Sequence, residues 1–147
     1  MKFLLDTSAY VGFKRNLVQV VEVIIKAELI LFSPIVLGEL MFGFRNGTKF
    51  EKNMNDLNKF LQHEIVKFVQ IEKITSDRYS RIAAQLKRQG TPIPTNDIWI
   101  AAQTMEYGAE LITLDKHFEA INGLVCTILH DTSQAIQNRF DKTFFVE

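Results

Sequence analysis

Four acidic residues stand in apolar surroundings along the chain, where an isolated charge is unusual. Asp6 follows the apolar residues 3–5, Glu39 lies within residues 35–42, Asp97 precedes the apolar residues 98–102, and Asp115 follows residues 111–114. Burying a carboxylate is costly unless a cation or hydrogen-bond donors compensate it. Because no lysine or arginine stands inside these motifs, we interpret the four acids as ligands of a shared cation.

The residue types indicate which cation and which chemistry. Ligand sets made only of oxygen are typical of hard cations such as Mg²⁺ or Mn²⁺, whereas zinc usually brings histidine or cysteine. A cation held by a few carboxylates keeps waters that can attack a phosphodiester, and a second ion roughly 4 Å away can stabilise the leaving oxygen. Ser8 and Thr113 each stand two residues from a strand-end acid. We expect them to orient the carboxylates or a bound water, the alternative being ordinary turn hydroxyls.

Each of these residues also has a purely structural interpretation. Glu39 alone could be a core acid satisfied by the backbone or by an arginine, and Asp97 alone could be a capping carboxylate at the start of a helix. His117, two residues past Asp115, is interpreted as a surface histidine rather than an RNA contact. Trp99 is expected to pack in the core rather than to stack on a base.

The hydrophobic pattern predicts elements that would bring the acids together. Short buried strands are predicted at residues 2–5, 29–32, 65–71, 111–113 and 125–129, with helical segments between them. This alternation is typical of an α/β fold with a mainly parallel sheet of about five strands and helices on both faces. The carboxyl edge of such a sheet is where ligands bind, and we expect all four acids there.

The predicted helix boundaries depend on capping residues. Residues 6–8 are predicted to form a turn, and Ser33-Pro34 to start the helix that carries Glu39. The remaining boundaries are Asn16 as the cap of the next helix, Thr75 or Ser76 as the cap of a helix that ends at Gly90, and Thr95 or Asn96 as the cap of a helix from Ile98 to Tyr107.

Length and composition bound the class of protein. The 147 residues, 47% apolar and 23% charged, suit one domain spanning 1–147, and no apolar run approaches a membrane span. The absence of a signal peptide and the single Cys126 favour a reducing cytoplasm. The net charge is zero, so any nucleic acid must bind a local basic patch. Candidates for that patch flank the predicted site: Lys14, Arg15, Arg45, Lys49, Lys87, Arg88 and Lys116.

Four segments together resemble the PIN-domain ribonucleases, and most closely the VapC-type toxins of toxin–antitoxin pairs. They are Leu5-Asp6-Thr7-Ser8, Gly38-Glu39-Leu40, residues 93–102 around Asn96-Asp97, and Thr113-Leu114-Asp115 with residues 116–118. The resemblance implies a compact α/β sandwich and RNA endonucleolysis. It also implies an acidic quartet of Asp6, Glu39, Asp97 and Asp115 that binds Mg²⁺ or Mn²⁺, with Ser8 and Thr113 in support.

The resemblance further implies two partners, a second copy of the chain and a cognate antitoxin that covers the acidic cleft. Apolar residues on neighbouring helices, with residues 144–146, would form part of the homodimer surface: Met41, Phe42, Phe44, Phe50 and Phe60. Residues 131–147 are a C-terminal extension longer than the family's usual ending. The alternatives are a PIN-like nuclease outside a toxin–antitoxin pair and a non-catalytic RNA- or protein-binding module. A phosphatase or phospho-acceptor domain is disfavoured, because Ser8 stands where such a domain would carry a second acid.

Overall fold

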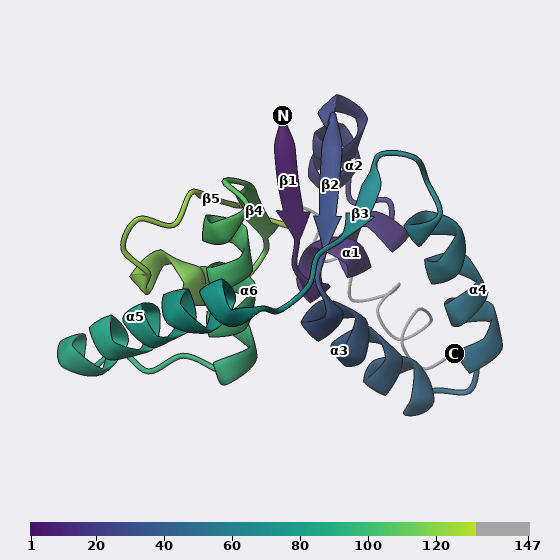
Figure 1. The fold of residues 1–147 in the computed structure, drawn as a ribbon. Helices are drawn as coiled ribbons and strands as arrows, with labels where there is room; N and C mark the ends of the chain where they lie inside the picture. The colour runs from purple at the N-terminus through teal and green to yellow at the C-terminus, as the bar shows by residue number, and fades with distance from the viewer. Residues whose placement is uncertain (132–147) are drawn as a thin grey trace.

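A single parallel sheet forms the centre of the protein, whose residues 1–131 are described by a computed structural model. The strands are β1 (Lys2–Leu5), β2 (Leu29–Phe32), β3 (Val66–Phe68), β4 (Glu110–Thr113) and β5 (Cys126–Ile128). All pairings are parallel, in the order β3-β2-β1-β4-β5 (Figure 1). The predicted α/β fold with a parallel sheet of about five strands is therefore confirmed.

Helices connect the strands and cover both faces of the sheet. They are α1 (Thr7–Lys14) and α2 (Val18–Lys26) before β2, α3 (Pro34–Arg45) and α4 (Phe50–Leu61) before β3, and α5 (Lys73–Gln89) and α6 (Thr95–Glu106) before β4. A 3₁₀ helix, η1 (Lys116–Ala120), lies between β4 and β5. In Figure 1, α2 lies behind β2, whereas the segment after β3 crosses in front of the sheet to reach α5 and α6.

The direction of the strand order reverses between β1 and β4. Strands β1, β2 and β3 follow one another toward one edge of the sheet, and β4 and β5 continue from β1 toward the other. In parallel α/β sheets a crevice forms beyond the carboxyl ends of the two strands that flank such a reversal. Asp6 directly follows β1 and Asp115 lies two residues past the end of β4, so the fold places both acids at this crevice.

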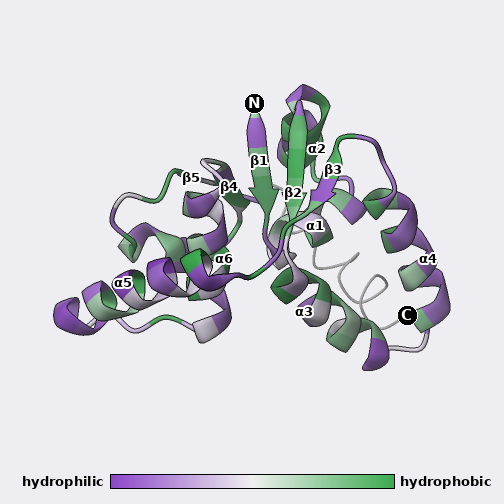
Figure 2. Cartoon of the chain, in the orientation of Figure 1, coloured by the Kyte–Doolittle hydropathy of each residue, from purple (hydrophilic) through white to green (hydrophobic). Residues whose placement is uncertain are grey.

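The core consists of the strands and the aromatic side chains packed on them. Residues 3–5 of β1 and 30–32 of β2 are at most 3% exposed, as expected for strands covered on both faces. Figure 2 shows β1 and β2 as largely hydrophobic and α5 as a mixture of hydrophilic and hydrophobic residues. Tyr10, Phe32 and Phe60 form edge-to-face ring contacts at 5.4–6.0 Å, so α1 and α4 are fixed to β2. Trp99 stacks on Tyr79 of α5, as predicted for a packing role.

The predicted turn at residues 6–8 was wrong, because this segment begins α1. Asp6 is the N-cap of α1, and its Oδ1 accepts a hydrogen bond from the backbone N–H of Ala9 at 2.9 Å. Asn16 was also wrongly predicted as a cap. It adopts a left-handed conformation with φ of 59°, and Leu17 is the N-cap of α2. Asparagine tolerates this conformation better than most residues, and here it separates two successive helices.

Two later helices begin earlier than predicted. Glu72, not Thr75 or Ser76, caps α5, and the Thr75 hydroxyl oxygen accepts from the Glu72 backbone N–H at 3.0 Å as the other half of a capping box. Pro94 is the N-cap position of α6, which therefore starts at Thr95 rather than after it. Ser33-Pro34 starts α3 and Gly90, with φ of 69°, ends α5, as predicted.

Strand β3 is shorter than the predicted 65–71, since the pairing with β2 covers only residues 66–68. Among the helices of residues 1–131, none has the length and apolarity needed to cross a bilayer. Residues 132–147 of the predicted C-terminal extension, including residues 144–146, lie outside the described residues.

Candidate active site

All four predicted acids line one cleft of about 400 Å³ at the carboxyl edge of the sheet. Asp6 and Asp115 come from the ends of β1 and β4, Glu39 from α3, and Asp97 from the first turn of α6. Ser8 and Arg15 of the α1 segment also line the cleft. Of the other predicted basic residues, Lys14 instead forms an ion pair with Asp56 of α4 at 3.3 Å.

Asp6 is held by hydrogen bonds on both carboxylate oxygens. Its Oδ1 accepts from the Ser8 hydroxyl at 2.7 Å and from the Ala9 backbone, and its Oδ2 accepts from the Thr113 hydroxyl. Ser8 and Thr113 also contact the segment after β4, since their oxygens accept from the backbone N–H groups of Leu114 and Asp115. Through these hydrogen bonds, the two hydroxyls connect the end of β1 to the end of β4.

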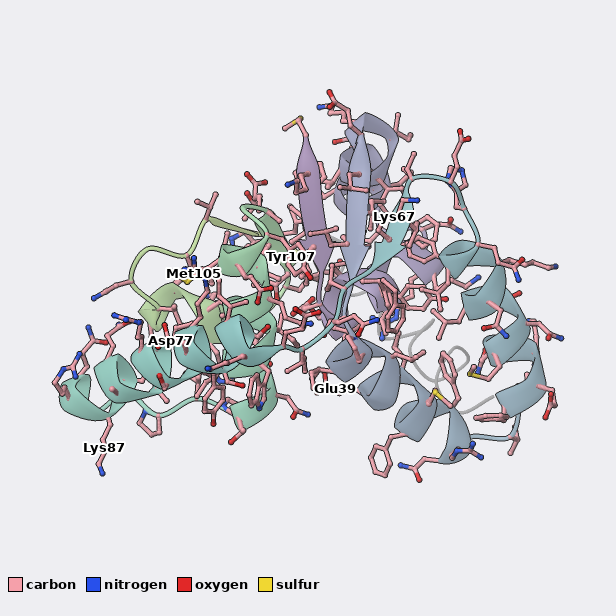
Figure 3. The ribbon with its side chains drawn as sticks, in the orientation of Figure 1. Glu39, Lys67, Asp77, Lys87, Met105 and Tyr107 are labelled. Atoms are coloured by element: carbon pink, nitrogen blue, oxygen red, sulfur yellow. The ribbon has the colours of Figure 1, made fainter. Side chains whose placement is uncertain are left out.

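Glu39 is held by two residues from other elements. Thr7 of α1 donates its hydroxyl to Oε1 at 2.6 Å, and the Asn96 amide of α6 donates to Oε2 at 3.5 Å. Figure 3 shows Glu39 on the side of α3 that faces α6. Thr7 and Asn96 therefore direct Glu39 into the cleft.

Asp97 and Asp115 share a neighbour in His117. The His117 ring Nδ1 lies 3.1 Å from Asp115 Oδ1 and 3.8 Å from Asp97 Oδ2. The His117 backbone N–H also donates to Asp115 Oδ1 at 2.9 Å. His117 is exposed, as predicted for a surface histidine, but the turn of η1 also brings its ring against the two acids.

Burial and mutual repulsion raise the pKa of two of the acids. Burial is the main reason that the pKa of Asp6 rises to about 6, and the hydroxyl hydrogen bonds oppose it only in part. For Asp97 burial again acts first, and the charges of Asp115, Glu39 and Asp6 then add to it, raising its pKa to about 6. The cleft thus concentrates negative charge that is costly without a cation.

The donor set fits a divalent cation. One donor atom each from Asp97, Asp115 and His117 lie within 4.8 Å of one another, a spacing that a single ion can bridge. Carboxylate oxygens are preferred by Mg²⁺ and Mn²⁺, and a cation would relieve the repulsion that raises the pKa of Asp97. The roles of the four acids as metal ligands and catalytic groups stay predictions.

Comparison with known proteins identifies the family of this chain. The model of the PIN domain matches residues 3–124, most of the chain. The chain belongs to the PIN-domain family. Ribonuclease VapC2 of Rickettsia felis is 34% identical over 106 residues, covering 71% of this chain and 77% of that protein. Ribonuclease VapC1 of Haemophilus influenzae strain R2866 is 28% identical over 129 residues, covering 84% and 95%.

A solved structure agrees with this assignment. The VapBC2 complex of Rickettsia felis, bound to a DNA fragment from its promoter, contains a chain that superposes with a TM-score of 0.77 at 27% identity. The match covers 88% of this chain and all of that chain. This PIN-domain protein is therefore related to the VapC ribonuclease toxins of VapBC toxin–antitoxin systems, and the predicted family is confirmed.

Sequence reasoning missed three residues of the site: Thr7, Asn96 and His117. Each is adjacent to or within two residues of a predicted acid, and this closeness is the signal that the three share. A signal for Thr7 lay in the capping pattern, because recognising Asp6 as an N-cap places Thr7 in the first turn of a helix at the cleft.

Proposed function

We propose that this PIN-domain protein is a Mg²⁺- or Mn²⁺-dependent endoribonuclease and the toxin of a toxin–antitoxin pair. The observation that carries the proposal is the meeting of four carboxylates in one cleft at the point where the strand order reverses. Its relatives named as VapC ribonucleases support RNA as the substrate.

In this proposal the acids of the cleft would bind the cation, and a basic residue beside them would contact the RNA. Asp6, with both oxygens fixed by hydrogen bonds, provides a carboxylate of defined position, and Glu39 is similarly aimed by Thr7 and Asn96. Asp97, from the first turn of α6, and Asp115, after β4, complete the ligand set. A cation bound there would activate water and offset the charge that develops on the phosphate. Arg15, which also lines the cleft, is suited to contact the RNA backbone.

The partners and the compartment belong to the same proposal. A VapBC relative crystallised as a complex with DNA supports a cognate antitoxin for this chain. We expect that antitoxin to cover the acidic cleft and the toxin itself to act as a homodimer in the cytoplasm.

Cleavage of total RNA in Mn²⁺, compared with EDTA, tests the nuclease. Wild type should cut in Mn²⁺ alone, and the products should carry a 5′-phosphate and a 3′-hydroxyl, because water and not the RNA 2′-hydroxyl is the proposed nucleophile. Asp97→Asn should lose at least about 100-fold of the rate, since it removes a ligand, whereas the exposed acid variant Glu22→Gln should not. A cyclic phosphate on the products would falsify this mechanism.

Expression in a bacterial host tests the toxin. Wild type expressed alone should arrest growth, and Asp97→Asn should not. A wild-type protein that cuts RNA in vitro but is harmless in cells would contradict the toxin and leave the nuclease standing.

A further inference from the structure

The His117 ring is largely exposed to solvent, yet it contacts two acids of the cleft. Its side chain is 56% exposed, so the ring has room to turn toward solvent. Instead the backbone N–H and the ring Nδ1 both lie against Asp115 Oδ1, at 2.9 Å and 3.1 Å. The same Nδ1 is 3.8 Å from Asp97 Oδ2. The ring nitrogen therefore stands between the two acids rather than beside them.

These separations are those of ligands around one ion. Donor atoms at about 2.1 Å from an octahedral cation are roughly 3 Å apart when adjacent and about 4.2 Å apart when opposite. The ring nitrogen and the two carboxylate oxygens lie 3.1 and 3.8 Å apart and within 4.8 Å as a group. A small rotation of the exposed His117 ring, with small adjustments of the two partly buried carboxylates, would bring all three onto a common ion.

We propose that His117 is a nitrogen ligand of the cation in this cleft, and that it makes the site prefer first-row transition ions such as Mn²⁺ to Mg²⁺. The inference rests on the cation site of the proposed function and adds which ion fills it. Mg²⁺ favours oxygen ligands and binds imidazole weakly, whereas transition ions accept nitrogen readily. A site of carboxylates alone would discriminate less between the two ions.

A binding experiment on the full-length chain tests this without RNA. Mn²⁺ is titrated into the metal-free protein at constant neutral pH, with free Mn²⁺ followed by electron paramagnetic resonance and Mg²⁺ added as competitor. Wild type should prefer Mn²⁺ by about tenfold or more, and His117→Ala should lose about tenfold in Mn²⁺ affinity with little change for Mg²⁺. His117→Gln, which offers an amide oxygen, should also lose the preference while still binding both ions.

A matched control uses a histidine far from the cleft. His63 lies in the exposed loop before β3, at the amino end of the sheet, and His63→Ala should leave both affinities unchanged. Unfolding temperatures in EDTA check that His117→Ala still folds, as its exposure leads us to expect.

The spectroscopic signature is independent of affinity. Electron spin-echo modulation of bound Mn²⁺ should contain a ¹⁴N coupling in wild type and in His63→Ala, and the coupling should vanish in His117→Ala. Mn²⁺ binding without that coupling would overturn the nitrogen ligand and leave the proposed function intact. Tighter binding of both ions by His117→Ala would also overturn it, because the ring would then be a competitor of the cation. No binding of either ion by wild type would remove the proposed function itself.

Discussion

Asp97 and Asp6 have similarly raised pKa values but different surroundings. Asp6 is buried and accepts hydrogen bonds from two hydroxyls and a backbone N–H. Asp97 is partly exposed, and the His117 ring Nδ1 lies 3.8 Å from its Oδ2, beyond hydrogen-bond length. Neutralising Asp97 therefore removes charge repulsion without breaking a hydrogen-bond network, whereas Asp6→Asn disturbs both.

The raised pKa of Asp97 predicts a pH-dependent gain in stability for Asp97→Asn. The carboxyl pKa is about 6 in the folded protein against an ordinary 3.8, so the folded state keeps this proton to higher pH than the unfolded chain. The resulting stabilisation is present below about pH 4 and is lost as the pH rises to about 6. Asparagine cannot ionise. In EDTA, the unfolding free energy of Asp97→Asn relative to wild type, measured with urea, should therefore increase between these pH values. The difference should stay constant above them.

Glu22→Gln serves as the control for this measurement, because Glu22 is exposed on α2. Its unfolding free energy should follow that of wild type at every pH. A gain for Asp97→Asn that is already complete at pH 4 would show that the repulsion argument is wrong.

Thr7 is predicted to act on the metal site through Glu39. Thr7→Val keeps the shape of the side chain but removes the hydroxyl that donates to Glu39 Oε1 at 2.6 Å. We expect Mn²⁺ affinity to fall by about tenfold, as for other residues that orient a ligand. The unfolding free energy in EDTA should change by no more than about 1 kcal/mol. Isothermal titration with Mn²⁺ measures the affinity, and urea unfolding in EDTA measures the stability. Thr91→Val, in the exposed loop before α6, should alter neither.

At the level of elements, Gln103 connects the helices that carry two of the acids. Gln103 of α6 is fully buried. Its Oε1 accepts from the Ser33 hydroxyl at the N-cap of α3, and its Nε2 donates to the Gln70 carbonyl at 3.3 Å. One amide thus ties α6, with Asp97, to the start of α3, with Glu39, and to the chain leaving β3.

Gln103→Leu is predicted to be strongly destabilising. The variant fills the same volume but leaves the buried Ser33 hydroxyl and the Gln70 carbonyl without their partner, which costs about 2–4 kcal/mol in unfolding free energy. Urea unfolding in EDTA measures this directly. Gln89→Leu, at the exposed end of α5, should stay within about 0.5 kcal/mol of wild type. A loss for Gln103→Leu no greater than that of Gln89→Leu would mean that water replaces the amide.

At the level of the whole molecule, Phe42 marks a surface suited to a second copy of the chain. It lies on α3 and is 69% exposed, although an aromatic ring of this size gains much by burial. If the proposed homodimer forms there, Phe42→Arg should convert dimer to monomer in light scattering. Ile25→Arg, a similarly exposed apolar position at the end of α2, should leave the assembly state unchanged. A wild type that is monomeric at high concentration would contradict the homodimer.

The sequence alone determined where the strands lie and which acids meet. Runs such as residues 3–5 and 111–112 are apolar without alternation because both faces of a parallel strand are covered. A parallel sheet has one carboxyl edge, so an acid placed just after β1 or β4 must reach it. Ser33-Pro34 and Gly90 similarly fix helix ends, since capping and left-handed backbone depend on the residue itself.

Only the tertiary structure decided the contacts that aim the acids. Thr7 meets Glu39 across 32 positions and Asn96 meets it across 57, and no local pattern encodes the rotation of one helix against another. The start of α1 was missed for a different reason, because Asp6 was interpreted only as a cleft acid and not also as the local N-cap. His117 is exposed as predicted, but its contact with Asp115 was not foreseen because the ring position depends on the turn after that acid. Spacing along the chain selects which residues reach an edge, whereas packing between elements sets the distances that chemistry requires.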